Sequence, residues 1–263
     1  MSCRALRWVA VCGVLCGPLA VVPRPPVGAV TDAAVPQAAT VDDIVARNLA
    51  AKGGVEKLRA VTSVKMAGRV KGPAGEMPTT SWAKRPNKMR REQITDGQIF
   101  VLGFDGMTVW QINPLVSPKA REITGPQADK TRQDAGDFDT PLLDYKARGT
   151  TVELIGTEPV QGVNMHRLRL TWKNGTIQET YINAETMLES RTVMQVEQGG
   201  RMAIVTLEFS NYKDVDGLTV PFHIRQLHNG RLMVEITYDS CQFNALMADA
   251  LFAMPVDPVG GRK

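Results

Sequence analysis

Apolar residues recur at every second position from Ser63 onward, and this period of two restricts the fold more than any other feature of the chain. Val64, Met66 and Val70 alternate with lysine and arginine, which is typical of a β-strand with one buried face. The alternation continues over residues 77–84, 89–95, 98–104, 108–113 and 151–243. Short breaks separate the runs, so the sequence predicts a single large antiparallel sheet of about ten or eleven strands.

A sheet of this width has a physical consequence for its concave side. Because strands twist, an open sheet of about ten strands curls strongly. Side chains, helices or a ligand must then fill the concave face of the curved sheet. The predicted fold class is therefore mainly β, an α+β arrangement in which a few helices serve one large, strongly curved sheet.

Helical signals precede the first strand. Thr40 can cap a helix over residues 41–51, because Asp43 stands three positions later and the apolar residues fall on one stripe. Gly53-Gly54 ends this helix. Residues 55–61 also show helical spacing, so a second short helix is expected before the sheet begins.

A polar insertion divides the strands into two groups. Residues 125–136 are predicted as a helix, and residues 139–145 as a shorter one that packs Leu142 and Leu143 downward. The insertion is the longest stretch between strands. We therefore expect these helices to cover the sheet in its middle.

The stretch GFDGMTVWQINP, residues 103–114, predicts a hairpin that is apolar on both faces, with Asp105-Gly106 as the turn. One face presents Phe100, Leu102, Phe104, Met107 and Val109, and the other presents Ile99, Val101, Trp110 and Ile112. One set can serve the interior of the sheet, whereas the other needs a second cover. We expect the face of Phe100 and Leu102 to be the concave one.

The sequence leaves two accounts of that cover open. In the first, the helix over residues 41–51 packs on one of the two faces and the protein binds nothing there. In the second, helices form a removable lid over an apolar cavity, and part of this surface meets lipid. The charged segment 125–149 is then the candidate for a mobile lid, and a static surface loop is the alternative.

Glycine-containing turns fix the register of the later strands. Two-residue turns are predicted at Asn174-Gly175 and at Gly199-Gly200, and a three-residue loop is predicted at residues 228–230. The pairs that these turns imply are Leu168 with Tyr181, Met194 with Val205, Ile224 with Val234, and Phe222 with Ile236. Each of these registers keeps large apolar residues on one face.

The first 29 residues have the pattern of a signal peptide. Arg4 and Arg7 precede an apolar run over residues 8–22, and Val27-Gly28-Ala29 supplies small residues at the cleavage positions. A membrane anchor is the alternative, but the run is about 15 residues long and a spanning helix needs roughly 20. The chain is thus predicted to divide into a leader (1–29), a flexible lead-in (30–39), one domain (40–255) and a tail (256–263).

Composition argues against several classes of function. The leader holds three of the 31 basic residues and none of the 27 acidic ones, so the remaining chain is nearly neutral and does not favour nucleic acid. Outside the leader Cys241 is the only thiol, which excludes an internal disulfide. The three imidazoles, His166, His223 and His228, lack the spacing of a zinc site. We expect no enzyme, no metal and no cofactor.

Several motifs together resemble a known family. In chain order they are the capped helix ending in Gly-Gly, WAKRPNKMRRE (82–92), GFDGMTVWQINP (103–114), DFDTPLLDYKARG (137–149), NYKDVDGLTVPF (211–222) and DALFAMP (249–255). Their order over residues 40–255 resembles the outer-membrane lipoprotein-sorting family, LolA-like and LolB-like, in its broader branch rather than its best-known carriers.

The resemblance implies a fold, a compartment and partners. It implies a half-open barrel closed by a lid of helices, standing in the periplasm, whose apolar concavity takes acyl chains of lipids or lipoproteins between the two membranes. An inner-membrane transporter and an outer-membrane acceptor are the implied membrane partners. A periplasmic lipid-sensing regulator of the same fold is the alternative.

We predict that the cavity is lined by large apolar residues of the strands. These are Val64, Met66, Trp82, Phe100, Leu102, Phe104, Trp110, Leu168, Leu170, Val205, Leu207, Phe209, Phe222 and Ile224. Because each methylene removed from water contributes about 0.8 kcal/mol, such a surface can hold an acyl chain without a specific polar contact.

Overall fold

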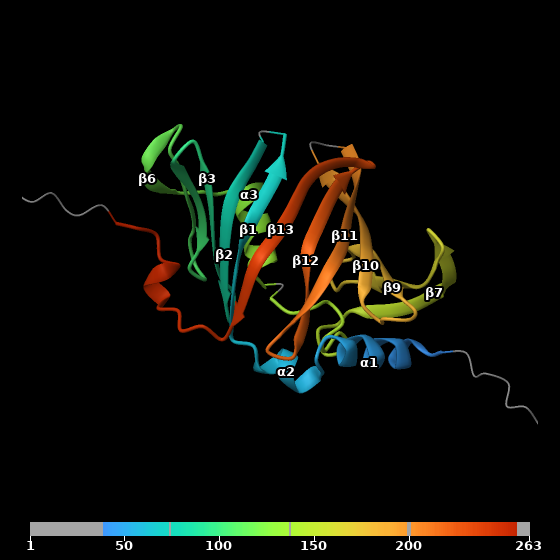
Figure 1. Cartoon of the computed structure of the whole chain (residues 1–263). Coiled ribbons are helices and arrows are strands. Elements are labelled where there is room, and N and C mark those ends of the chain that lie inside the picture. The colour runs from blue at the N-terminus through green and yellow to red at the C-terminus, as the bar shows by residue number, and fades with distance from the viewer. Residues whose placement is uncertain (1–38, 74, 137, 199–200, 257–263) are drawn as a thin grey trace, which may run out of the picture. The chain divides into compact units, whose positions relative to one another are not determined.

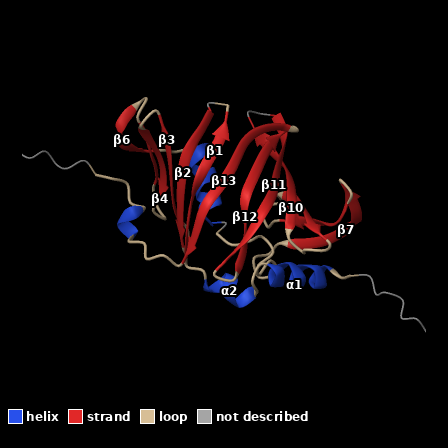
Figure 2. Cartoon of the chain, viewed as in Figure 1, coloured by secondary structure: helices blue, strands red, loops and turns tan. Residues whose placement is uncertain are grey.

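The computed structural model describes residues 39–73, 75–136, 138–198 and 201–256, which belong to one compact unit beginning at Ala39. Within this part the chain forms one antiparallel sheet of thirteen strands accompanied by a few helices (Figures 1 and 2). The predicted leader, the lead-in up to residue 38 and the tail from residue 257 lie outside the described residues. None of the helices in the described part is long and apolar enough to cross a membrane.

The strands follow one another through hairpins in two groups. The first group is β1 (Ser63–Gly72), β2 (Gly75–Lys84), β3 (Lys88–Thr95), β4 (Gln98–Phe104), β5 (Val109–Asn113) and β6 (Ser117–Glu122). The second is β7 (Thr151–Val160), β8 (Val163–Thr171), β9 (Ile177–Asn183), β10 (Glu189–Gln198), β11 (Arg201–Val215), β12 (Leu218–His228) and β13 (Arg231–Phe243). β1 pairs with β13, so the two groups join at the centre and leave β6 and β7 at the edges.

The predicted fold class is confirmed, and the predicted number of strands is corrected upward. β6 has the sequence SPKARE, which lacks the alternation of large apolar residues used to recognise the other strands. It nevertheless pairs with β5, because Gln111 stands opposite Arg121 in the ladder. Pairing with an existing strand, rather than its own pattern, places this edge strand in the sheet.

Three α-helices lie in the described part: α1 (Val41–Ala51), α2 (Val55–Ala60) and α3 (Pro126–Gly136), followed near the end by a short 3₁₀ turn, Asp249–Leu251. α1 begins with the expected capping box between Thr40 and Asp43. Residues 141–149 form turns, which corrects the expectation of a helix over residues 139–145. Leu142 and Leu143 are still buried, at 1% and 3% exposure, because they pack against the core beneath α1.

Cross-strand pairing divides the side chains of the sheet between two faces. We call the face on which α1 and α3 pack the inner face and the opposite one the outer face. Paired residues share a face in an antiparallel ladder. The inner face therefore runs without a break through partners such as Leu168, Thr180, Thr192, Leu207 and Gln226.

α1 seals the inner face at one end of the sheet. Its residues Ile44, Val45 and Leu49 pack with Leu168, Leu170 and Ile182 of β8 and β9. The Asn48 side chain donates a hydrogen bond of 2.7 Å to the Met187 carbonyl, and Lys52 forms an ion pair with Glu189. Burial of apolar side chains, the hydrogen bond and the ion pair together hold α1 against the sheet.

α3 covers the inner face at the other end of the sheet. Ala128 and Ala135 of the helix pack with Phe104 and Val109 of the β4–β5 hairpin. Most other residues of α3 are exposed, and its sequence PQADKTRQDAG is strongly polar. The buried residues of this helix, Ala128, Thr131 and Ala135, therefore all have small side chains.

The C-terminal segment covers the outer face of the same hairpin. Trp110 and Phe252 are both fully buried, and the Trp110 Nε1 donates to the Phe252 carbonyl at 2.8 Å. Gly103 lies opposite Trp110 in the ladder, and a Cβ on Gly103 would stand 2.3 Å from the indole ring. The hairpin is apolar on both faces because α3 covers one face and the C-terminal segment covers the other.

Basic residues of β2 and β3 hold the C-terminal segment in place. Lys84 and Arg90 donate to the carbonyls of Met247 and Leu251, at 2.7 Å and 3.0 Å. Hydrogen bonds from Lys84 and Lys88 lower the pKa of Asp249 to about 2. Asp249 therefore stays ionised and paired throughout the neutral and mildly acidic range.

The three predicted turns give three different outcomes. The pairing of Met194 with Val205 across residues 199–200 is confirmed. At Asn174-Gly175 the prediction is wrong by one residue: Leu168 pairs with Thr180, because Trp172 bonds to Thr176 around a longer loop. The predicted loop at residues 228–230 is also wrong, because His228 pairs with Arg231 across a two-residue turn and a bulge shifts the register to Ile224 opposite Ile236.

Removing the Phe252 ring tests the outer cover. Phe252→Ala should lower the free energy of unfolding by about 3–5 kcal/mol, because the Phe252 side chain is fully buried and its truncation leaves a cavity beneath the segment. Leu246→Ala is the matched control in the same segment, since Leu246 is fully exposed and its truncation should change stability by less than about 0.5 kcal/mol. Urea unfolding followed by tryptophan fluorescence measures both, and equal stabilities for the two variants would contradict this account of the segment.

Candidate functional site

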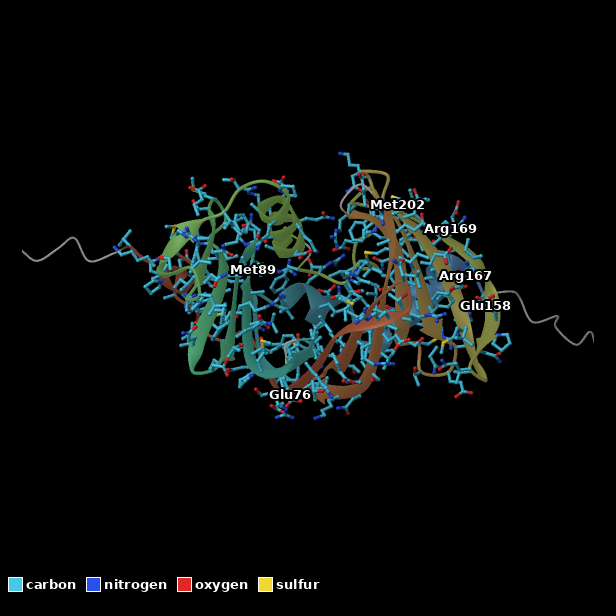
Figure 3. The ribbon with its side chains drawn as sticks, turned by 90° about the horizontal axis from the view of Figure 1, so that it is seen from above. Glu76, Met89, Glu158, Arg167, Arg169 and Met202 are labelled. Atoms are coloured by element: carbon cyan, nitrogen blue, oxygen red, sulfur yellow. The ribbon has the colours of Figure 1, made fainter. Side chains whose placement is uncertain are left out.

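The middle of the inner face is an apolar surface between the two helix-covered zones. α1 packs on β7, β8 and β9, and α3 packs on β3, β4 and β5. Side chains of β1, β2 and β10 to β13 occupy the stretch between them, and Figure 3 shows these strands from above. The apolar ones are Val64, Met66, Val70, Met77, Met194, Val196, Val205, Leu207, Phe209, Phe222, Ile224, Val234, Ile236 and Tyr238.

Most of these side chains are only partly buried. Val205 and Phe222 are 9% and 4% exposed, whereas Leu207, Phe209 and Ile224 keep intermediate exposure. Apolar residues in this position gain free energy when a further apolar group covers them. The inner face thus keeps apolar surface that neither helix covers.

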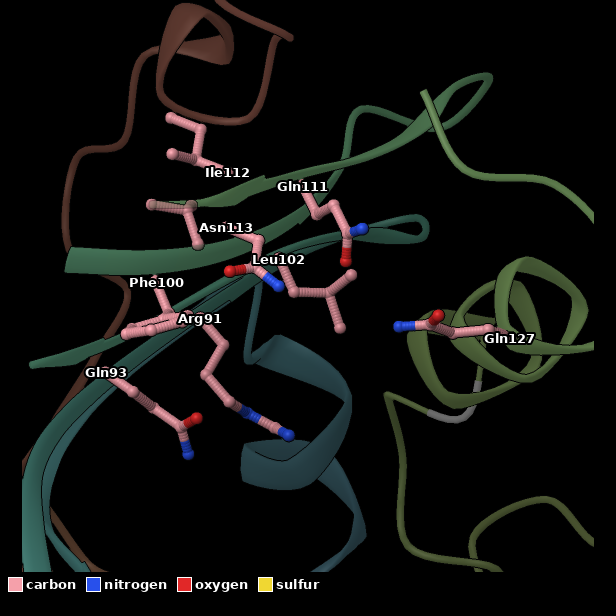
Figure 4. A pocket seen from close by; sticks show the side chains of 9 residues that line it. Arg91, Gln93, Phe100, Leu102, Gln111, Ile112, Asn113 and Gln127 are labelled. Carbon is pink, nitrogen blue, oxygen red and sulfur yellow. The ribbon is translucent and has the colours of Figure 1, made fainter. Parts of the chain in front are cut away.

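A cavity of ≈ 210 Å³ lies between α3 and strands β3 to β5, next to this surface. Its lining comes from β3, β4, β5 and one residue of α3: Arg91, Gln93, Phe100, Val101, Leu102, Gln111, Ile112, Asn113 and Gln127. In Figure 4 Leu102 of β4 and Gln127 of α3 point toward one another across the space. The cavity is therefore lined by apolar side chains together with a group of polar ones that includes the Arg91 guanidinium.

A second cavity of ≈ 260 Å³ includes one residue of α3 and is lined mainly by polar residues. It is lined by Gln133, Arg148, Thr150, Trp172, Lys173 and Asn174. The Arg148 guanidinium lies over the Trp172 ring, 5.8 Å from its centroid. The largest apolar side chain of this cavity is therefore already in contact with a charged group. The first cavity, which continues onto the apolar inner face, is the better candidate for an apolar ligand.

Burial keeps two ionisable groups of the inner face neutral. It raises the pKa of the Cys241 thiol to about 11, and it raises the pKa of the Tyr238 hydroxyl as well. Both groups therefore remain neutral at physiological pH, and Cys241 is a poor nucleophile. Arg91 is the charged residue among those that line the first cavity.

Twelve of the fourteen predicted residues lie on the inner face. Trp82 and Trp110 lie on the outer face, which corrects the expectation that all fourteen share one surface. The Lys65 ammonium lies 5.8 Å from the Trp82 ring, and Trp110 is sealed beneath Phe252. Of the twelve, Leu168 and Leu170 are buried beneath α1 and Phe104 beneath α3, so nine remain with the open zone or the cavity.

One polar part of the site was not predicted from the sequence. Arg91, Gln93, Gln111 and Asn113 line the first cavity, yet their residue types alone give no sign of it. Strand alternation could have identified these residues, because Leu102 of β4 pairs with Arg91 of β3 on one side and with Gln111 of β5 on the other. A register through β3, β4 and β5 would have placed them on the inner face.

The histidines take part in hydrogen bonds between or along strands. The His223 Nδ1 forms a hydrogen bond of 2.9 Å with Ser210 Oγ, and its Nε2 forms one of 2.9 Å with Glu235 Oε1. This chain of groups lies on the outer face, and other residues line both cavities. Burial lowers the pKa of His166, whose Nδ1 lies 2.8 Å from Thr157 Oγ1. Among the described residues, no group of three or more His, Cys, Asp or Glu side chains is arranged to hold a metal ion.

Comparison with known proteins finds likeness in structure rather than in sequence. No family model and no curated protein matches the chain. A DUF1329 family protein from Desulfovibrio piger matches with a TM-score of 0.55 and 15% identity, over 81% of this chain and 97% of its own. A LolA superfamily protein from Nitrosomonas europaea matches with a TM-score of 0.53 and 15% identity, over 82% and 98%.

A third solved structure is named for outer-membrane lipoprotein sorting. It is a domain from Vibrio parahaemolyticus that matches with a TM-score of 0.50 and 14% identity, over 80% of this chain and 94% of its own. These matches cover nearly the whole length of each relative. They identify the fold of this chain as LolA-like, which confirms at the level of the fold the resemblance carried by its sequence motifs.

Proposed function

We propose that this protein is a carrier that shelters acyl chains of lipids or lipoproteins on its inner face, in the periplasm between the two membranes. The apolar zone of the middle strands carries the proposal, because side chains such as Leu207, Phe209 and Ile224 remain partly exposed beside a cavity. The predicted signal peptide supports the compartment. An inner-membrane transporter and an outer-membrane acceptor are the partners that such a carrier needs.

The size of the cavity favours a cover that moves. Ligand pockets for small molecules usually measure about 300–1,000 Å³, and the first cavity measures ≈ 210 Å³. An acyl chain therefore needs more room than this cavity offers. Displacement of α3 would join the cavity to the apolar zone of the middle strands and supply that room.

α3 is better suited to such movement than α1. Its buried residues are Ala128, Thr131 and Ala135, whereas α1 buries Ile44, Val45 and Leu49. Hydrophobic stabilisation scales with the apolar area removed from water, so lifting α3 exposes much less apolar surface than lifting α1.

The segment after α3 is fixed to the α1 end of the molecule. Arg59 binds the Asp144 carboxylate at 2.6 and 3.1 Å, and Tyr145 donates to Asp42 at 2.7 Å. The Lys52 ammonium donates to the Thr140 hydroxyl at 3.0 Å. We therefore narrow the proposed lid from residues 125–149 to α3 itself.

Hydrogen exchange tests which helix is the lid. Backbone amides of α3 should exchange at least about tenfold faster than those of α1, because opening α3 costs less burial. Mass spectrometry of exchanged peptides from each helix measures the ratio in one sample, so α1 serves as the internal control. Equal protection of both helices would contradict a removable α3.

Leu102→Glu tests the proposed binding surface. Leu102 lines the first cavity, so a carboxylate there should weaken binding of a fluorescent sixteen-carbon acyl probe by about tenfold or more. Ile99→Glu is the matched control on the outer side of the same strand, where the side chain is 47% exposed. Circular dichroism checks that both variants fold, and equal loss of binding in the two would refute the assignment of the inner face.

Arg91→Gln tests the polar lining of the cavity. The guanidinium is placed to pair with an anionic head group, so the change should weaken binding of a free fatty acid more than binding of its neutral methyl ester. Competition against the acyl probe measures both affinities. Loss of both ligands to the same extent would show that Arg91 shapes the cavity without recognising charge.

A further inference from the structure

The β5–β6 turn presents two large apolar side chains to solvent. Leu115 is 77% exposed and Val116 is 63% exposed, and they are adjacent in the chain. Neither packs into the two buried clusters of the sheet. Adjacent apolar residues at a projecting tip are typical of a surface that docks elsewhere.

The turn is ordered before it meets any partner. The Val116 amide donates to the Asn113 carbonyl at 2.9 Å, and the Leu115 amide donates to the Asn113 side-chain oxygen at 3.1 Å. Pro114 restricts the backbone at the first position of the same turn. Little conformational entropy is therefore lost when the tip becomes buried.

A second apolar tip lies at the same end of the sheet. β3 to β6 are consecutive antiparallel neighbours, so the β3–β4 and β5–β6 turns fall at one end, and the β4–β5 turn falls at the other. Ile94 and Ile99 pair beside the β3–β4 turn and are 41% and 47% exposed. Both turns lie in the upper part of Figure 1.

Positive charge adjoins the exposed turn. β6 carries the exposed Lys119 and Arg121, and its single acidic residue, Glu122, stands at the end of the strand away from the turn. A pair of apolar side chains followed by two basic ones matches the interface of a bilayer, where acyl chains lie beneath anionic head groups.

We propose that the β5–β6 turn inserts into the surface of an anionic lipid bilayer. Leu115 and Val116 enter the acyl boundary, and Lys119 and Arg121 contact the head groups. Gln111, Ile112 and Asn113 precede the turn directly and line the first cavity, so docking brings the cavity to the lipid surface. The use of that cavity rests on the proposed carrier function, whereas insertion of the turn does not require cargo.

A position-specific probe tests the insertion. Leu115→Cys and Met107→Cys are each labelled with an environment-sensitive fluorophore in a Cys241→Ser background. Met107 is the matched control, because it is 85% exposed in the β4–β5 turn at the opposite end of the sheet. The protein is recovered from a secreting bacterial host, and mass spectrometry determines its amino terminus.

Vesicles of phosphatidylglycerol with phosphatidylcholine should shift the emission of the label at residue 115 to the blue and leave the label at residue 107 unchanged. An unchanged emission at residue 115, or equal shifts at both positions, would overturn the proposal. Failure of the protein to bind these vesicles would overturn the proposal as well, and would favour a protein partner for the turn.

Substitutions separate the apolar and the electrostatic contributions. Leu115→Asp with Val116→Asp should lower vesicle affinity by about tenfold or more, and Met107→Asp should leave it unchanged. Lys119→Gln and Arg121→Gln should each cost about fivefold on anionic vesicles, and the loss should shrink as salt increases. Equal affinities for all these variants would refute the assignment.

Binding of the acyl probe in solution distinguishes this proposal from the proposed function. The Leu115→Asp, Val116→Asp protein should bind the probe as well as the unaltered protein does. If the unaltered protein docks on vesicles but binds no acyl probe, the carrier function fails and membrane docking stands. If it binds the probe but does not dock, the carrier function stands and the docking proposal fails.

Discussion

Cross-strand pairing holds each side chain of this protein to one face of a single sheet, and the rest of the structure depends on that constraint. A one-residue shift between any two strands would exchange the inner and outer faces beyond it. The bulges between β12 and β13 and between β1 and β13 change the register locally. Ile236 nevertheless pairs with both Ile224 and Val70, so the apolar face continues across the centre.

The width of the sheet then creates more apolar surface than its helices cover. α1 seals the end at β7 to β9, and α3 covers β3 to β5. Between them the side chains of the central strands are stabilised by neighbours on the same face, with partial exposure to solvent. The β4–β5 hairpin shows the opposite arrangement, because α3 and Phe252 bury it from both sides. The hairpin, covered on both faces, thus lies beside central strands whose inner face is partly exposed.

The sequence predicts the faces of this sheet better than its turns. Alternation assigns twelve of the fourteen residues to one face and Trp110 to the other. Trp82 also lies on the outer face, since it pairs with Lys65 and Arg90. The turn at Gly175 encloses a longer loop than its dipeptide indicates, because the Trp172 amide bonds to Thr176. The bulge beside Leu232 depends on packing across strands distant in sequence, so no local pattern reveals it. The same holds for the burial of Trp110, whose partner Phe252 lies 142 residues away.

Unequal helices are what a reversible binding site on such a sheet requires. A carrier must keep its apolar surface dry when loaded and expose it for transfer, yet the sheet must not unfold when the surface opens. α1 and the C-terminal segment bury large side chains, and they fix the sheet at its edge and on its outer face. α3 buries two alanines and a threonine, so it can leave the inner face at small cost. The exposed Leu115 and Val116 follow the residues that line its cavity, which places the weakest cover beside the part of the molecule best suited to meet lipid.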